Sequence, residues 1–315
     1  MRWTNRIRFA FLMPAVIWVM VFTIFPLGYS LFAAFHTLES KTEVERVEVP
    51  RLNADGTPSL RADGTPRTKT EVVRTSVTTW TFVGFKNFAR VFTDGQVAEA
   101  VKVTLIFVVC AVTTEILLGL ALAYLFHQAI PMRAFMRTVM ILPIFATPVA
   151  AGYLFFTIFY EEGGPLGWTG IPFLSDPNWA LASVIMVDIW QWTPFCFLVF
   201  LAALQSVPED QVEAASLDTN SNWDIWREVV LPAITPVIVI VTLLRLVEAL
   251  KVFDVVASLT VGGPGNATQS VSYLAFRTGL RFFDVGYASV MAYMLLAFVM
   301  VIVTFFFKRV RQVYA

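Results

Sequence analysis

Hydrophobic residues in this chain gather into long runs that are separated by shorter polar segments. The first run, residues 9–35, holds no charged residue and exceeds the roughly 20 apolar residues that a helix needs to cross a bilayer. Further runs predict helices at residues 97–126, 135–160, 179–205, 233–258 and 285–307, with a re-entrant or interfacial helix at 268–283. The pattern therefore predicts an all-α membrane protein with six transmembrane helices surrounded by membrane lipid.

Basic residues at the ends of these runs predict their orientation. They precede the first and third runs and follow the last, at Arg2, Arg6, Arg8, Arg133, Arg137, Lys308, Arg309 and Arg311. Because Lys and Arg accumulate on the cytoplasmic side, both termini are expected in the cytoplasm. We divide the chain into an N-terminal transmembrane helix (1–36), an extracytoplasmic insert (37–96), a transmembrane core (97–307) and a cytoplasmic tail (308–315).

The insert at 37–96 differs in kind from the rest of the chain. It is polar, carries charges of both signs and repeats the sequence Ala-Asp-Gly-Thr-Pro at 54–58 and 62–66. Asp-Gly is a signal for the tight turn of a β-hairpin, so a small hairpin outside the membrane is predicted. Two interpretations stay open: a contact for an external binding protein, or a packing insert.

Composition excludes several classes of protein. The chain is 57% hydrophobic and 15% charged, with a mean hydropathy of +0.69, far from the composition of a soluble domain. Its formal net charge is zero, which gives no case for a nucleic-acid partner. The two cysteines, Cys110 and Cys196, lie within apolar runs, so neither a disulfide nor a metal site is expected.

A polar segment at 206–232 lies between two apolar runs and has the features of a helix–turn–helix. Ser206 and Glu209 have capping-box spacing and Pro208 lies in the first turn, which predicts a helix start. Short polar side chains at 218–222 predict a break, because they compete for backbone hydrogen bonds.

A second short helix should follow the break, with Trp223, Trp226 and Val230 on one face. It is expected to end at Leu231, because Pro232 disfavours helix at the residue before it. Two short helices at the mouth of a membrane domain would make a docking surface.

The same segment resembles the EAA coupling loop of ABC importer permeases. The resemblance rests on Glu213, Ala214, Ala215, Asp218, Trp223, Trp226, Leu231 and Pro232. It implies that the loop sits in a cleft of a cytoplasmic ATPase, with Glu213 paired to a basic group there. Thr219 stands where the family usually has glycine, and Asn220 or Asn222 is expected to supply a left-handed turn residue instead.

Further stretches resemble carbohydrate-type members of that family. They are residues 82–88, 188–195, 201–205, 259–264 and 287–289. The resemblance implies a permease subunit of a carbohydrate importer in the bacterial inner membrane, with a second related permease, an ATPase dimer and an extracytoplasmic sugar-binding protein as partners. The sequence contains no G-x-x-x-x-G-K-[ST], so ATP and Mg are expected on the ATPase, and this chain is not expected to be an enzyme.

Polar residues within the apolar runs are candidate pathway residues, because an ionisable group there costs about 2.5–3.5 kcal/mol on insertion scales. Asp188, Gln191 and Trp192 lie at i, i+3 and i+4 and share one helical face. A carboxylate, an amide and a flat ring suit the hydroxyls and apolar face of a sugar. Alternatively, Asp188 lies near the outer end of its helix and is simply hydrated.

Arg245, Glu248, Lys251 and Asp254 recur at every third position with alternating sign, so neighbours could pair along one face. They would line the translocation route or contact a second permease, or else form a charge ladder within the helix. Glu115 is expected to pair within the bundle. The alternative function is an ion-coupled secondary transporter that uses Glu115, Asp188 or Glu248 as its ion site.

Overall fold

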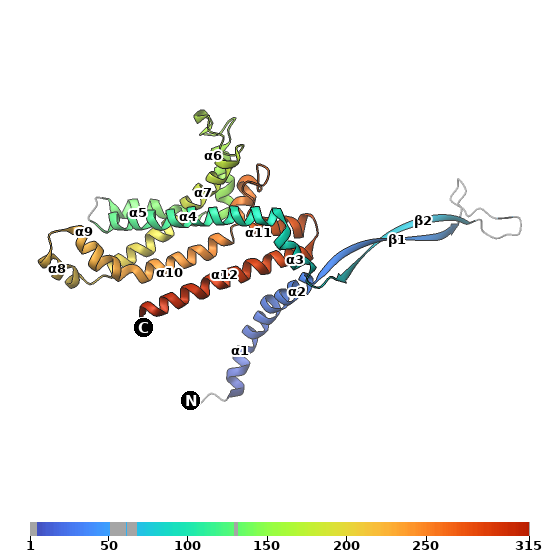
Figure 1. Ribbon diagram of the computed structural model, residues 1–315, viewed down its shortest axis with the longest axis horizontal. Coiled ribbons are helices and arrows are strands. Elements are labelled where there is room, and N and C mark those ends of the chain that lie inside the picture. The colour runs from blue at the N-terminus through green and yellow to red at the C-terminus, as the bar shows by residue number, and fades with distance from the viewer. Residues whose placement is uncertain (1–4, 51–60, 62–67, 129–131, 315) are drawn as a thin grey trace.

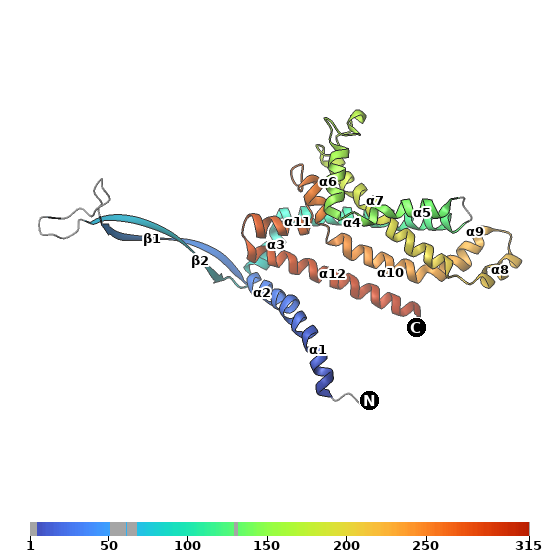
Figure 2. The ribbon, with the colours of Figure 1, turned by 180° about the vertical axis from the view of Figure 1, so that it is seen from behind.

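The computed structural model of the chain describes residues 5–50, 61, 68–128 and 132–314. A bundle of helices forms the body, a long hairpin projects from one end of it, and the N-terminal helix stands at an angle to it (Figures 1 and 2). In the described part, five helices are long and apolar enough to cross a membrane, and a bent helix pair gives a possible sixth span. The all-α membrane fold expected from the apolar runs is confirmed.

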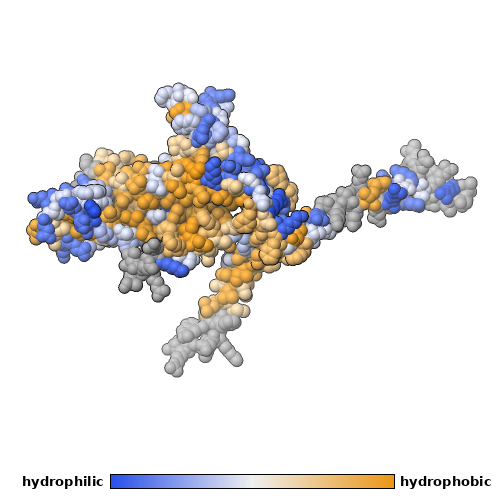
Figure 3. Space-filling view, viewed as in Figure 1, coloured by the Kyte–Doolittle hydropathy of each residue, from blue (hydrophilic) through white to orange (hydrophobic). Residues whose placement is uncertain are grey.

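The N-terminal span is built from helix α1 (Asn5–Val19), a π-helical turn η1 (Met20–Ile24) and helix α2 (Phe25–Ala34). In the most hydrophobic stretch of this span, no residue is buried by the rest of the chain, and the surface is continuously hydrophobic (Figure 3). The C-terminal part of this span contacts helix α12 (Val285–Tyr314). The first predicted membrane helix is therefore present, packed against the bundle near its C-terminal end.

The predicted β-hairpin is confirmed by strands β1 (His36–Pro50) and β2 (Thr68–Phe82). They pair antiparallel in one unbroken register, from His36 opposite Phe82 to Pro50 opposite Thr68. Fifteen residues at about 3.4 Å per residue make an arm of roughly 50 Å. The repeats at 54–58 and 62–66 lie outside the described residues.

The core of the bundle lies between helices α4 (Gly95–His127) and α7 (Pro177–Gln205). Gly119 allows a close approach here, because a Cβ added to it would lie 2.6 Å from the Cβ of Cys196. Buried aromatic side chains such as Phe126, Phe197 and Phe200 belong to the same core cluster as Cys196. Helix α10 (Leu231–Leu250) packs against both helices and completes a three-helix core.

The third span is bent, so the single helix predicted at 135–160 is wrong. Helix α5 (Arg133–Ile141) and the 3-10 turn η2 (Leu142–Phe145) meet helix α6 (Pro148–Phe159) at an angle of 101°. Ala146 and Thr147 are extended between them, and the Thr147 hydroxyl caps α6 by accepting from the Ala150 N–H at 3.3 Å. Pro148 occupies the first turn of α6, where its missing N–H costs nothing.

The predicted helix end at Leu231-Pro232 is also wrong. Helix α9 (Asn222–Ile225), the π turn η4 (Trp226–Val230) and α10 run on as one helix of 29 residues. The π turn explains how proline fits, because the Leu231 N–H bonds to the Trp226 carbonyl five residues back and Pro232 follows directly after this shift. The continuous helix ends at Leu250, before the predicted boundary at 258.

Short helices complete the chain. Helix α3 (Lys86–Thr93) follows the hairpin, and a 3-10 turn η3 (Gly167–Thr169) lies in the loop between α6 and α7. Helix α8 (Glu209–Asp218) precedes α9. After α10 come the π turn η5 (Val256–Thr260), helix α11 (Val271–Phe276) and the π turn η6 (Arg277–Arg281). Helix α11 and η6 occupy most of the region predicted as a re-entrant or interfacial helix at 268–283.

Candidate functional site

A buried charge cluster joins the three core helices. Arg245 of α10 donates from Nε and Nη2 to the two carboxylate oxygens of Glu115 on α4, at 2.6 and 2.9 Å. Its Nη2 also donates to Asp188 of α7 at 2.8 Å. The exposed fractions of these residues are 2%, 0% and 5%, so the cluster is almost fully buried. A single guanidinium therefore holds two carboxylates from different helices.

This cluster replaces the predicted charge ladder on the fifth helix. Glu248 and Lys251 do pair as expected, at 3.0 Å, on an exposed surface. Arg245 instead pairs across the bundle, and Asp254 lies beyond the end of α10, so the i+3 spacing no longer aligns it with its neighbours. The expectation that Glu115 pairs within the bundle is confirmed.

Asp188 and Arg245 of this cluster line a cavity of about 220 Å³ at the end of α10. The cavity is lined by Pro148, Asp188, Trp192, Arg245, Glu248, Ala249, Lys251, Val252, Phe253, Asp254 and Val255. Asp188 lines this cavity although it is buried. The alternative prediction, that Asp188 is simply hydrated at the outer end of its helix, is therefore wrong. The Arg245 guanidinium lies 4.6 Å from the centroid of the Trp192 ring and covers one face of it.

Gln191 does not share this cavity with Asp188 and Trp192. Its Nε2 donates to the Ala146 carbonyl at 2.7 Å, at the bend between η2 and α6. Its Oε1 has no hydrogen-bond partner among the described residues. Gln191 therefore connects the bent span to α7. Its predicted contact with substrate stays a prediction, and this geometry does not support it.

The polar segment at 206–232 contains α8, a short extended link and the start of the long helix. Ser206 caps the end of α7 by donating to the Ala203 carbonyl at 2.7 Å, so the predicted capping box with Glu209 is wrong. Pro208 stands at the N-cap of α8 without a side-chain cap, and Glu209 and Asp210 place negative charge in the first turn, which favours a helix start.

The turn after α8 needs no left-handed residue. Thr219 is extended, with φ −146° and ψ 144°, and the expected positive φ at Asn220 or Asn222 is absent. The Thr219 hydroxyl accepts from the Ser221 N–H at 3.1 Å and lies 3.4 Å from the Asp224 carboxylate. An extended threonine with these bonds explains how the chain turns without the glycine that the family usually has.

Helix α8 presents its surface to the outside of the molecule. All ten of its residues are described and none is buried, including Glu213, Ala214, Ala215 and Asp218. Leu217 is 88% exposed and Trp223 is 67% exposed, which leaves two large apolar side chains uncovered. Trp226 lies on the inside instead, packed edge-on against Tyr124 at 4.8 Å between ring centroids.

A groove of about 470 Å³ separates α8 from the ends of α4 and α7. Glu209 and Glu213 line it from α8, and Tyr124, His127 and Gln128 line it from α4. Both residues therefore border this groove and are also exposed at the surface. Leu231 and Pro232 lie in the first turn of α10, beyond this groove.

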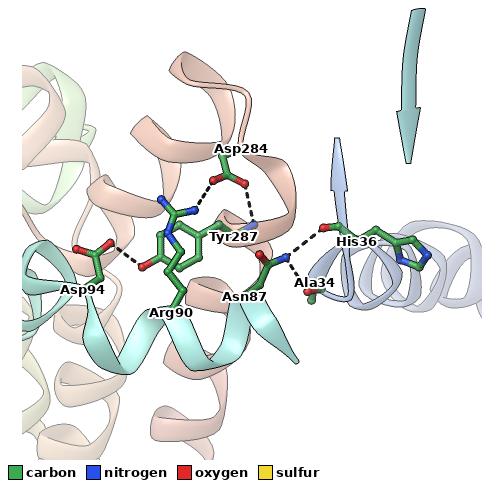
Figure 4. Close-up of polar contacts among 7 residues, drawn as sticks. All are labelled: Ala34, His36, Asn87, Arg90, Asp94, Asp284 and Tyr287. Atoms are coloured by element: carbon green, nitrogen blue, oxygen red, sulfur yellow. Dashed lines mark hydrogen bonds and ion pairs between the residues drawn. The ribbon is translucent and has the colours of Figure 1, made fainter. Parts of the chain in front are cut away.

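A second polar cluster, which sequence reasoning missed, fastens the hairpin to the bundle (Figure 4). Asn87 of α3 donates from Nδ2 to the carbonyls of Ala34 and His36, both at 3.1 Å, where α2 passes into β1. Gly286 packs against the same place, since a Cβ added to it would lie 2.0 Å from the His36 carbonyl oxygen.

The cluster continues from α3 onto α12 and α4. Arg90 pairs with Asp284 at 2.8 Å and its guanidinium lies 3.9 Å from the centroid of the Tyr287 ring. The Tyr287 hydroxyl donates to Asp94, the N-cap residue of α4, at 2.7 Å. The one signal for it in the sequence is the helix cap at Asp94.

Comparison with known proteins gives the family. Residues 115–312 match the binding-protein-dependent transport system inner membrane components. The probable ABC transporter permease protein y4oQ of Sinorhizobium fredii is 37% identical over 70% of this chain and 74% of its own length. The trehalose/maltose transport system permease protein MalF of Thermococcus litoralis is 32% identical over 70% of this chain and 76% of its own length.

Solved structures share the fold. A bacterial alginate ABC transporter in complex with an alginate pentasaccharide-bound periplasmic protein matches 98% of this chain and 95% of its own chain, with a TM-score of 0.76 and 22% identity. A bacterial ABC transporter involved in the import of the acidic polysaccharide alginate gives a TM-score of 0.74 with 22% identity, over 98% and 96% of the two chains. The ion-coupled alternative finds no support in these comparisons. The chain belongs to the binding-protein-dependent transport system inner membrane components, the permease subunits of ABC importers.

Proposed function

We propose that this chain forms one half of the translocation pathway for a carbohydrate in an ATP-driven importer. The observation that carries the proposal is a continuous helix, Asn222–Leu250, which joins the exposed α8–α9 segment to the Arg245 cluster and its cavity. At 1.5 Å per residue this helix is roughly 43 Å long, so one rigid element spans the distance from a docking surface to a polar cavity.

A separate ATPase pair would bind ATP and Mg and grip α8. The uncovered Leu217 and Trp223 side chains would enter its cleft, and Glu213 would pair with a basic group there. Closure of the ATPase pair on ATP would displace α8, and the continuous helix would carry that displacement to Arg245. The cavity would then alternate between outward-facing and inward-facing arrangements of the bundle.

The cavity beside Arg245 is the proposed contact for substrate on this chain. Asp188, Glu248 and Asp254 would accept hydrogen bonds from sugar hydroxyls, and the uncovered face of Trp192 would pack against the sugar ring. A second related permease would supply the other half of the pathway. The sugar-transport assignments of relatives such as the trehalose/maltose permease support the carbohydrate class.

The remaining partner lies outside the cell in this proposal. With both termini in the cytoplasm of a bacterium, the hairpin, which extends from the end of the bundle opposite α8 (Figure 1), would project on the outer side of the inner membrane. An extracytoplasmic sugar-binding protein would dock on that side, as the solved alginate importer does with a periplasmic protein. The polar cluster around Asn87 would then hold the hairpin at a fixed angle to receive it.

The proposal is tested by reversing one charge in α8. In the assembled importer, Glu213→Lys should insert and assemble but lose most substrate uptake while ATP hydrolysis continues, because the grip on α8 fails. Glu228→Lys is the matched control, since that exposed carboxylate does not line the groove. Full uptake by Glu213→Lys, or equal loss in the control, would count against the proposal.

A further inference from the structure

We propose that the cavity beside Arg245 admits uncharged carbohydrates and rejects anionic ones such as uronates and sugar phosphates. This inference rests on the proposed function and adds a charge preference to it. Two observations support it. Acidic side chains outnumber basic ones in the cavity wall, and both basic side chains there are paired with carboxylates.

Three acidic and two basic side chains line the cavity: Asp188, Glu248, Asp254, Arg245 and Lys251. Both basic side chains are bonded to carboxylates, Lys251 to Glu248 at 3.0 Å and Arg245 to Asp188 at 2.8 Å. The carboxylate of Asp254 makes no hydrogen bond or ion pair to any described residue. The unpaired charge that faces the cavity is therefore negative.

Behind the cavity wall, Glu115 makes this balance more negative. It takes two of the hydrogen bonds of Arg245, at 2.6 and 2.9 Å, so one guanidinium already serves two carboxylates. An anionic substrate would bring a third negative group to the same positive charge. Any anion that pairs with Arg245 would share its one positive charge with Glu115 and Asp188, and the net charge of the cluster would become more negative.

A neutral sugar meets no such obstacle. Its hydroxyls can donate to the carboxylates of Asp254 and Glu248 without adding charge to the site. For an anion held about 8 Å from Asp254, one like charge at an effective dielectric constant of about 20 weakens binding by more than tenfold. The shared fold does not imply a shared charge preference, since the solved alginate importer handles an acidic polysaccharide.

The test compares two matched sugars on the assembled importer in nanodiscs, without the extracytoplasmic binding protein, so that selection by that protein plays no part. The probes are maltose and the corresponding disaccharide in which a carboxylate replaces one hydroxymethyl group. Saturation-transfer NMR measures their binding to the wild type, to Asp254→Asn, to Asp254→Lys and to the control Glu162→Gln. Asp254 is exposed, which makes both variants compatible with folding, and Glu162 lies outside the cavity.

We expect the wild type and Glu162→Gln to prefer maltose by at least tenfold. Asp254→Asn should reduce this preference severalfold and Asp254→Lys should abolish it, and the wild-type preference should fall as salt concentration rises. Equal binding of the two sugars by the wild type, or an unchanged preference in Asp254→Lys, would overturn the inference while leaving the carbohydrate assignment intact. Binding of neither sugar would overturn the carbohydrate assignment of this cavity and the inference with it.

Discussion

Arg245 and Glu115 are 130 positions apart in the sequence and share two hydrogen bonds of 2.6 and 2.9 Å in the middle of the bundle. This contact fixes α10, which continues from α9 and η4 as one helix, to α4. Because both residues are almost fully buried, neither charge can be compensated by water if its partner is removed.

Removal of the Arg245 charge alone should therefore destabilise the protein more than removal of all three charges of the cluster. Arg245→Met leaves the Glu115 and Asp188 carboxylates unpaired, which we expect to cost about 3–5 kcal/mol. Adding Glu115→Leu and Asp188→Asn to Arg245→Met should recover most of the lost thermal stability, measured by size-exclusion chromatography after heating. A triple variant less stable than Arg245→Met would contradict the charge-pairing account.

The hairpin base offers a second test, of geometry rather than charge. Gly286→Ala places a methyl group 2.0 Å from the His36 carbonyl oxygen, so the contact between α12 and the hairpin must open. We expect a broader distance distribution between spin labels on the hairpin and on α12. Gly28→Ala is the control, because a Cβ at Gly28 meets open space, and it should leave the distribution unchanged. An equally narrow distribution in Gly286→Ala would contradict the prediction that this close contact holds the hairpin in place.

The turn after α8 gives a third prediction. Thr219→Gly restores the residue usual in the family but removes the hydroxyl that binds the Ser221 N–H and adds backbone freedom. We expect more ATP to be hydrolysed per substrate molecule taken up, because a looser link transmits less displacement. Thr219→Ser keeps the hydroxyl and should behave as the wild type. A gain in coupling with glycine would contradict this prediction.

The loop between α6 and α7 depends on one carboxylate. Glu161 accepts from the Leu174 N–H at 3.0 Å and from the N–H and hydroxyl of Ser175 at 2.9 and 2.8 Å. These bonds, with that from Leu174 first, hold the pKa of Glu161 below its ordinary value. A carboxyl group with a lowered pKa stabilises the fold above the ordinary range near 4.3 and loses that contribution as pH falls through the lower value.

The mobility of the loop should therefore stay constant between pH 5 and 8 and increase below about pH 4. A spin label at the exposed Trp168, introduced as Trp168→Cys in a Cys110→Ser background, would report this by its line shape. Glu161→Gln should be mobile at every pH. A mobility change between pH 5 and 7 in the parent would contradict this role of Glu161.

The elements that the sequence predicted well are those that depend on a local pattern of hydrophobic and polar residues. Uninterrupted apolar runs gave the spans, because a bilayer requires about 20 apolar residues whatever the tertiary contacts. The polar segment at 206–232 gave an exposed α8. The bend at Pro148 and the uninterrupted helix through Pro232 escaped prediction, because membrane helices accommodate proline by local 3-10 and π turns.

The sequence predicted several residues of the candidate site but not how their side chains pair. Asp188, Trp192 and Arg245 were singled out, yet the helical spacing around Arg245 favoured Glu248 as its neighbour rather than Glu115. The signal for the observed pairing was present: three ionisable residues in separate spans must satisfy one another, because each alone is costly. Which carboxylates reach the guanidinium depends on how α4, α7 and α10 pack, and helical spacing within α10 does not encode that.

The account rests on contact between α8 and an ATPase, and the most direct measurement is site-specific cross-linking in the assembled importer. A photo-reactive residue replaces Leu217 on α8, and the control position is Val44 on the hairpin, which is also exposed. We predict that the Leu217 position cross-links to the ATPase subunit and that the Val44 position does not. Absence of any product between the Leu217 position and the ATPase, or such a product from the Val44 position, would contradict the account.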